Sequence, residues 1–139
     1  MDPSSRYLTF HGAIILLIGL LCGAPYGRAI NRGTPASIVQ SWRVAHLSLP
    51  IGAILMFAVA TPLTSFMVPA DIKQLIADLL IISGYSFCFS LPLAALTGER
   101  GLSYRGSLTA KAVFLGNALG AATSLLAALA LIYAAFKSL

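Results

Sequence analysis

Residues 44–70 read VAHLSLPIGAILMFAVATPLTSFMVPA and contain no charged side chain. A helix needs about 20 apolar residues to cross the hydrocarbon core of a bilayer, and this stretch is long enough. Three more uncharged stretches of comparable length lie at residues 7–27, 79–98 and 112–136. None of them alternates with the period of two that marks a barrel strand. The sequence therefore predicts an all-α, integral membrane bundle of four transmembrane helices.

The composition of the whole chain favours the same fold class. Of 139 residues, 58% are hydrophobic and 9% are charged, whereas a soluble domain carries roughly 25% charged residues. The net charge of +5 is spread without a basic run, which argues against nucleic-acid binding. The length fits one domain, so we expect a single membrane domain over residues 1–139. Its helices are predicted near residues 7–28, 38–68, 72–97 and 107–136.

The first apolar stretch is expected to be a membrane helix rather than a cleaved signal, because it is long and no A-x-A cleavage site follows it. Four spans put both termini on one side of the membrane. Six of the nine basic residues then fall on the other side: Arg28, Arg32, Arg43, Arg100, Arg105 and Lys111. The positive-inside rule assigns that side to the cytoplasm. We therefore expect a multi-pass protein, in the inner membrane of a bacterium.

Two histidines lie within the predicted helices. If its helix starts near Ser37, His46 lies about nine residues, or roughly 13 Å, along it. A neutral imidazole there could hydrogen-bond a neighbouring carbonyl, or it could ligate a metal or a haem iron. His11 lies near the start of the first helix, at the opposite face, where we expect a structural or interfacial role. Two histidines without a nearby carboxylate make a poor zinc or di-iron site.

Other polar residues in the predicted helices need partners, because an unpartnered polar group is costly in a membrane. Asp78 is predicted at a partly solvated helix end, with a proton relay as the alternative. Asn117 is predicted to form an interhelical hydrogen bond. Tyr85 could orient a substrate or bond a carbonyl. No G-x-S-x-G, H-E-x-x-H or P-loop motif occurs, so any chemistry would depend on a cofactor.

Three short motifs resemble the styrene oxide isomerase family. The motifs are His11-Gly12 opening the first helix, Trp42-x-x-Ala45-His46 before a proline in the second, and Arg100-Gly101-Leu102 after the third. The four-span layout, the chain length and an aromatic-rich segment that opens at Gly84 agree with the same family. The resemblance covers most of the chain.

The resemblance implies a trimer of four-helix subunits that binds haem b between subunits. It implies that His46 is the axial ligand and that ferric iron acts as a Lewis acid, converting an aryl epoxide to an aldehyde. The expected haem-binding residues are His46, Trp42, Arg43, Arg100 and Arg105. The three arginines are the expected partners of the haem propionates. One axial histidine per subunit leaves an open site on the iron, which suits Lewis-acid chemistry.

Two positions depart from the family pattern. The family has an asparagine six residues after the ligand histidine and a tyrosine seven residues after the glycine that matches Gly84. Here these positions are Gly52 and Leu91, and Tyr85 and Ser48 are the expected catalytic substitutes.

The leading hypothesis is a haem-dependent isomerase of a small apolar epoxide. The alternatives are a non-enzymatic haem protein for electron transfer or sensing, with a neighbouring subunit's His11 as second ligand, and a structural tetraspan without a cofactor.

Overall fold

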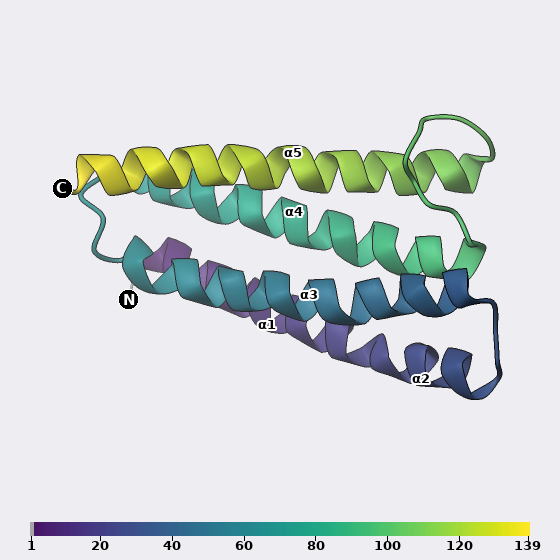
Figure 1. The fold of residues 1–139 in the computed structure, drawn as a ribbon. Helices are drawn as coiled ribbons and strands as arrows, with labels where there is room; N and C mark the ends of the chain where they lie inside the picture. Colours follow the sequence, from purple (N-terminus) through teal and green to yellow (C-terminus); the bar gives the residue numbers. More distant parts are fainter. Residues whose placement is uncertain (1) are drawn as a thin grey trace.

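The computed structural model describes residues 2–139, and this part of the chain is helical and contains no strand (Figure 1). The helices are α1 (Pro3–Leu21), α2 (Gly23–Asn31), α3 (Ala36–Leu63), α4 (Ala70–Thr97) and α5 (Leu108–Lys137). Four segments are long and apolar enough to cross a membrane: Pro3–Asn31, Ala36–Leu63, Ala70–Thr97 and Leu108–Lys137. The predicted all-α class with four membrane-spanning helices is confirmed.

The first span consists of two helices. Asp2 caps α1 because its side chain accepts a hydrogen bond from the backbone N–H of Ser4 at 2.9 Å. Pro3 suits the first helical position, where a missing N–H has no cost. The helix is interrupted at Cys22 and continues as α2. Pro25 cannot donate to the carbonyl four residues earlier, which weakens helical bonding at this break. The expected helix near residues 7–28 therefore corresponds to α1 and α2 together.

The other helix ends follow local chemistry. Helix α3 ends at Leu63, earlier than the expected bound at residue 68, one residue after Pro62. Helix α4 ends at Thr97 and is capped by Gly98, whose φ of 74° is the left-handed conformation that glycine adopts readily. Ser107 caps α5 by accepting a hydrogen bond from the backbone N–H of Ala110 at 3.1 Å.

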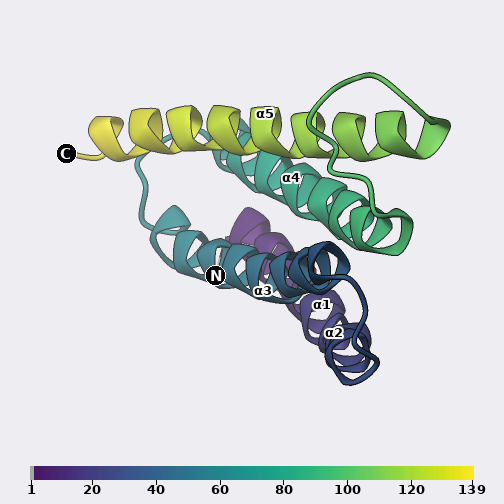
Figure 2. The same ribbon diagram turned by 45° about the vertical axis from the view of Figure 1, so that its right-hand side comes forward.

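Helix α5 stands apart from half of the bundle. Helix α1 packs against α3 and α4, and α3 packs against α4. Among the described residues, α5 packs against α4 alone. Figure 2 shows this arrangement, with α4 between α5 and the α1–α3 pair. A groove lies between α3 and α5, and residues of α3, α4 and α5 line it.

Close packing inside the bundle depends on glycines. A Cβ atom on Gly19 would collide with Pro50 of α3, and one on Gly116 would lie 2.8 Å from the Cβ of Ser90 in α4. These glycines belong to the two G-x-x-x-G motifs at residues 19–23 and 116–120. Both motifs pack helices within one chain, as such motifs do in membrane proteins.

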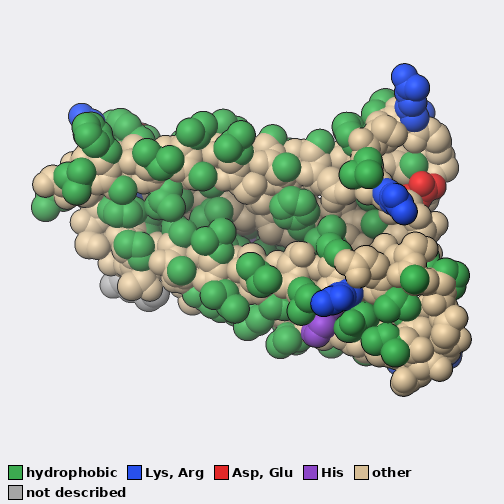
Figure 3. Space-filling view, viewed as in Figure 1, with side chains coloured by type: hydrophobic (Ala, Val, Ile, Leu, Met, Phe, Trp, Pro, Cys, Tyr) green, Lys and Arg blue, Asp and Glu red, His purple; other side chains and the backbone are tan. Residues whose placement is uncertain are grey.

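Charged side chains gather at one end of the bundle. Figure 3 shows most of the visible basic side chains where α2 meets α3 and where α4 meets α5. The opposite end holds an ion pair between Lys73 Nζ and Asp2 Oδ2 at 3.7 Å. The surface between the two ends carries many exposed Leu and Ile side chains, as a lipid-facing surface does.

Candidate functional site

His46 lies on α3 where that helix passes the break between α1 and α2. Its Nδ1 is 3.0 Å from the carbonyl oxygen of Gly19, and the imidazole is half-buried. A carbonyl oxygen only accepts, so Nδ1 carries the proton and Nε2 keeps its lone pair. This is the tautomer of a histidine that binds a metal through Nε2, with a backbone carbonyl orienting the ring.

Gly23 provides the space for this imidazole. A Cβ atom on Gly23 would lie 2.9 Å from His46 Cε1. The ring centroid of Tyr26 lies 6.0 Å from that of His46. Gly19 therefore supplies the hydrogen-bond acceptor, and Gly23, one helical turn later, supplies the room. The sequence motif at residues 19–23 shapes the histidine site as well as the helix packing.

The four other expected cofactor residues lie at different places. Trp42 is 9% exposed and belongs to the hydrophobic core. Arg43 is exposed, three residues before His46 and thus on a neighbouring part of the α3 surface. Arg100 lines a polar cavity in the α3–α5 groove. Arg105 is exposed in the connection between α4 and α5. Trp42 and Arg43 therefore lie within one helical turn of His46, whereas Arg100 and Arg105 lie in the connection that follows α4.

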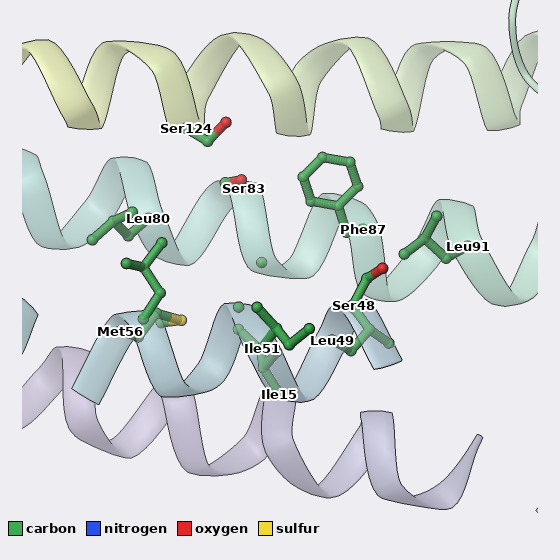
Figure 4. Close-up of a pocket in the computed structure, with 13 residues that line it drawn as sticks. Ile15, Ser48, Leu49, Ile51, Met56, Leu80, Ser83, Phe87, Leu91 and Ser124 are labelled. Atoms are coloured by element: carbon green, nitrogen blue, oxygen red, sulfur yellow. The ribbon is translucent and has the colours of Figure 1, made fainter. Parts of the chain in front are cut away.

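An apolar cavity of about 350 Å³ occupies the groove between α3, α4 and α5 (Figure 4). Its only hydroxyl groups belong to three serines. Ser83 donates to the carbonyl of Gly120 at 2.8 Å, and Ser124 donates to that of Ala121 at 2.9 Å. Ser48 has no hydrogen-bond partner within residues 2–139. Figure 4 shows its hydroxyl directed from α3 toward the side where Phe87 and Leu91 lie.

A second cavity of about 340 Å³ continues the groove toward the charged end of the bundle. Leu91 lines both cavities. The second cavity is more polar, with Gln40, Arg100 and Asn117 in its wall. Asn117 Oδ1 is buried and has no partner among the described residues, so the hydrogen bond that we expected between helices is not made by this oxygen.

A family model for styrene oxide isomerase matches residues 4–136, nearly the whole chain. The chain belongs to the styrene oxide isomerase family. A search of curated protein sequences found no match. The predicted resemblance is thus confirmed, and membership supports an isomerase-type activity for this multi-pass membrane protein. Gly52 and Leu91, the two positions where we expected a departure from the family pattern, both line the apolar cavity.

Tyr85 does not face this cavity. Its hydroxyl lies 2.9 Å from Nδ1 of His11, and the edge of Tyr7 packs on the same imidazole with ring centroids 4.4 Å apart. Tyr85, one of the two expected catalytic residues, therefore lies beside neither His46 nor Ser48. The pairing of Tyr85 with His11 carried no sequence signal, because the two residues are 74 positions apart.

Asp78 also has a partner of its own. Gln74 Nε2 donates to Asp78 Oδ1 at 2.7 Å, and Ser4 donates to Gln74 Oε1 at 3.0 Å. The half-buried Asp78 carboxylate is thus tied to the end of the bundle that contains both termini. It lies outside the two cavities of the groove.

Within one chain, His46 and the apolar cavity lie on different flanks of α3. His46 turns toward α1 and α2, as its contacts with Gly19 and Gly23 show. Ser48 lines the groove on the α5 side. Two residues along a helix are separated by about 200° around its axis, which accounts for the division.

Proposed function

We propose that this chain is a haem b-dependent isomerase that converts a small apolar epoxide to an aldehyde within the membrane, and that His46 would hold the haem iron. Family membership supports the isomerase class. The single observation that carries the haem assignment is the hydrogen bond between His46 Nδ1 and the Gly19 carbonyl. It fixes the tautomer whose Nε2 can donate a lone pair to iron. We assign the protein to a bacterial inner membrane.

The residues fit a haem better than a bare metal ion. Among residues 2–139, no three His, Cys, Asp or Glu side chains come together as a metal site within one chain. A haem brings its own four nitrogen ligands and needs a single imidazole from the protein. Ferric haem, when bound, would supply a Lewis acid for the epoxide oxygen.

Arginine side chains are available for the two propionates. Arg43 lies beside His46, while Arg100 lies with Gln40 in the polar cavity at the same end of the bundle. Charge-assisted hydrogen bonds from a guanidinium to a carboxylate are the strong class of such bonds. We assign Arg43 and Arg100 to the propionates and Arg105 to the outer edge of the site. Trp42 acts as a positioning residue, since its buried indole anchors α3 one turn before His46.

His46 and the apolar cavity lie on different flanks of α3, and this supports a site shared between copies. In a cyclic oligomer such as the trimer that the resemblance implies, His46 of one copy can face the groove of the next. The groove would supply apolar walls, which exclude water from the opened epoxide and so favour an aldehyde over a diol. The free Ser48 hydroxyl would donate a hydrogen bond to the substrate oxygen. The rearrangement is redox-neutral and needs no second cofactor.

The main alternative, electron transfer through a haem with two histidine ligands, fits less well. His11 follows Phe10 and precedes Gly12, which packs against Phe57, whereas His46 packs against Gly19 and Gly23. The two imidazoles are therefore separated by roughly 12–18 Å along α1, at 1.5 Å per residue. Every copy in a ring about the membrane normal has its His11 at that same different depth. Neither the same chain nor a neighbour can then offer His11 to an iron held by His46.

The test is the conversion of an aryl epoxide to its aldehyde by haem-loaded protein in lipid nanodiscs, followed by gas chromatography. We expect aldehyde from the parent and from His11→Ala, the matched control at the other membrane histidine. His46→Ala should reduce the rate to background. A fully haem-loaded parent that converts no epoxide in a panel would remove the isomerase assignment, and full activity in His46→Ala would remove the ligand assignment.

A further inference from the structure

Close packing explains most of the glycines in the helices of this chain. In six of them, an added Cβ atom would come within 3.0 Å of a neighbouring side chain: Gly12, Gly19, Gly23, Gly84, Gly116 and Gly120. Gly27 and Gly52 are different, because no atom lies within 4 Å of an added Cβ at either position. Gly27 belongs to α2, near the charged end of the bundle. Gly52 lies in the middle of α3.

No contact within the described chain therefore explains why residue 52 is a glycine. Glycine weakens a helix relative to alanine, because it has more backbone freedom to lose and no side chain to pack. Gly52 also lies on the wall of the apolar cavity. A residue that leaves space where nothing in the chain fills it points to an occupant from outside the chain.

We infer that Gly52 sets the size of the hydrocarbon body that the apolar cavity accepts. This inference rests on the proposed function in taking the physiological occupant to be an epoxide. Ser48 lies one turn earlier on the same face of α3, since residues i and i+4 are neighbours on a helix surface. The substrate oxygen lies at the Ser48 hydroxyl and the hydrocarbon body lies along Gly52.

The cavity wall around Gly52 fits an apolar body. Leu55 follows on α3, and Phe87 and Leu91 line the same cavity from α4. These side chains offer only carbon atoms, so they recognise shape and volume through dispersion contacts rather than a polar group. The substrate class is an epoxide with a bulky hydrocarbon part and no second polar group. A side chain at position 52 would occupy the same space and exclude the larger members of the class.

The test compares Gly52→Ala and Gly52→Phe with Gly27→Phe as the matched control. Two inert probes, toluene and 1-methylnaphthalene, are added to protein in nanodiscs, and the rise in Tm is followed against probe concentration. We expect the parent and Gly27→Phe to be stabilised by both probes. Gly52→Phe should keep the Tm of the parent without probe and lose at least tenfold in affinity for the larger one, as pocket-filling carbon atoms do elsewhere. Gly52→Ala should lie between them.

Three results would overturn the inference. They are a parent that responds to neither probe, a Gly52→Phe variant that responds to both as the parent does, and a Gly52→Phe variant with an altered oligomeric state by light scattering. The last result would mean that the space receives a second copy of the chain. Because the probes carry no oxygen and need no haem, probe binding without epoxide turnover would remove the isomerase proposal and leave this inference standing. Epoxide turnover with unchanged size selectivity in the Gly52 variants would remove this inference and leave the isomerase proposal standing.

Discussion

The two membrane histidines have the same side chain but different hydrogen-bond partners. His46 Nδ1 faces the Gly19 carbonyl, whereas His11 Nδ1 faces the Tyr85 hydroxyl. A carbonyl can only accept, so it leaves Nε2 of His46 with a free lone pair. The Tyr85 hydroxyl can donate or accept, so it does not fix which ring nitrogen of His11 carries the proton. Of the two histidines, only His46 therefore has a partner that fixes the tautomer of a ligand that binds through Nε2.

The largest expected effect comes from displacing the His46 ring. In Gly23→Val, the new side chain meets His46 Cε1, which a Cβ alone would approach to 2.9 Å. The imidazole must turn away from the Gly19 carbonyl and lose its orientation. Because partners that orient a ligand contribute about 10- to 100-fold to affinity, haem affinity should fall by that factor in a haem titration.

The control for this variant is Gly27→Val in the same helix, where an added Cβ meets no atom within 4 Å. It should bind haem as the parent does. Equal affinities for both variants and the parent would break the comparison, because His46 would then not depend on its setting.

A smaller effect is expected at the other histidine. Tyr85→Phe removes the hydroxyl that is hydrogen-bonded to His11 and leaves a half-buried imidazole nitrogen without its partner. The cost should be about 1–3 kcal/mol in the free energy of unfolding, measured by denaturant titration in mixed micelles. The haem spectrum should not change. The exposed Tyr133 offers the control Tyr133→Phe, which should leave stability unaltered, and a changed spectrum in Tyr85→Phe would contradict a purely structural role for the His11–Tyr85 pair.

The smallest effect concerns acid stability at the His11 end of the bundle. Partial desolvation raises the pKa of Asp2, but hydrogen bonds from Ser4 and the charge of Lys73 outweigh it, so the pKa lies below its usual value. A lowered folded-state pKa gives stability that is fully present above the unfolded pKa of about 3.9. That stability is lost as the pH falls through the lower folded value. The parent should therefore lose stability below about pH 4.

Two substitutions separate the charge of Asp2 from its capping role. Asp2→Asn should keep the helix cap and flatten this acid dependence, while Asp2→Ala should cost about 1 kcal/mol at neutral pH. Thermal melts between acid and neutral pH measure both. If Asp2→Asn had the same acid dependence as the parent, the effect would not originate at this carboxylate.

The sequence predicted the four spans because the length of an uncharged stretch is a property of the chain alone. It also predicted His46 as a candidate ligand, since an imidazole between uncharged residues stands out, and that assignment stays a prediction. It did not predict the isolation of α5, because that depends on which helices pack together. The break at Cys22 was also missed, although Pro25 is a local signal for it. Ser48, Ser83 and Ser124 look alike in sequence. Only the packed structure distinguishes Ser48, whose hydroxyl is free, from the two serines that bond a helix carbonyl.

The central claim is that His46, and not His11, holds a haem iron with one open position. The most direct measurement is the absorption spectrum of ferric protein purified with a haem supply, recorded for the parent, His11→Ala and His46→Gly. We predict a Soret band with a five-coordinate, high-spin signature in the parent and in His11→Ala. His46→Gly should lose the band and regain it when free imidazole fills the vacated space. A colourless parent, or a Soret band that is the same in His46→Gly as in the parent, would contradict the account.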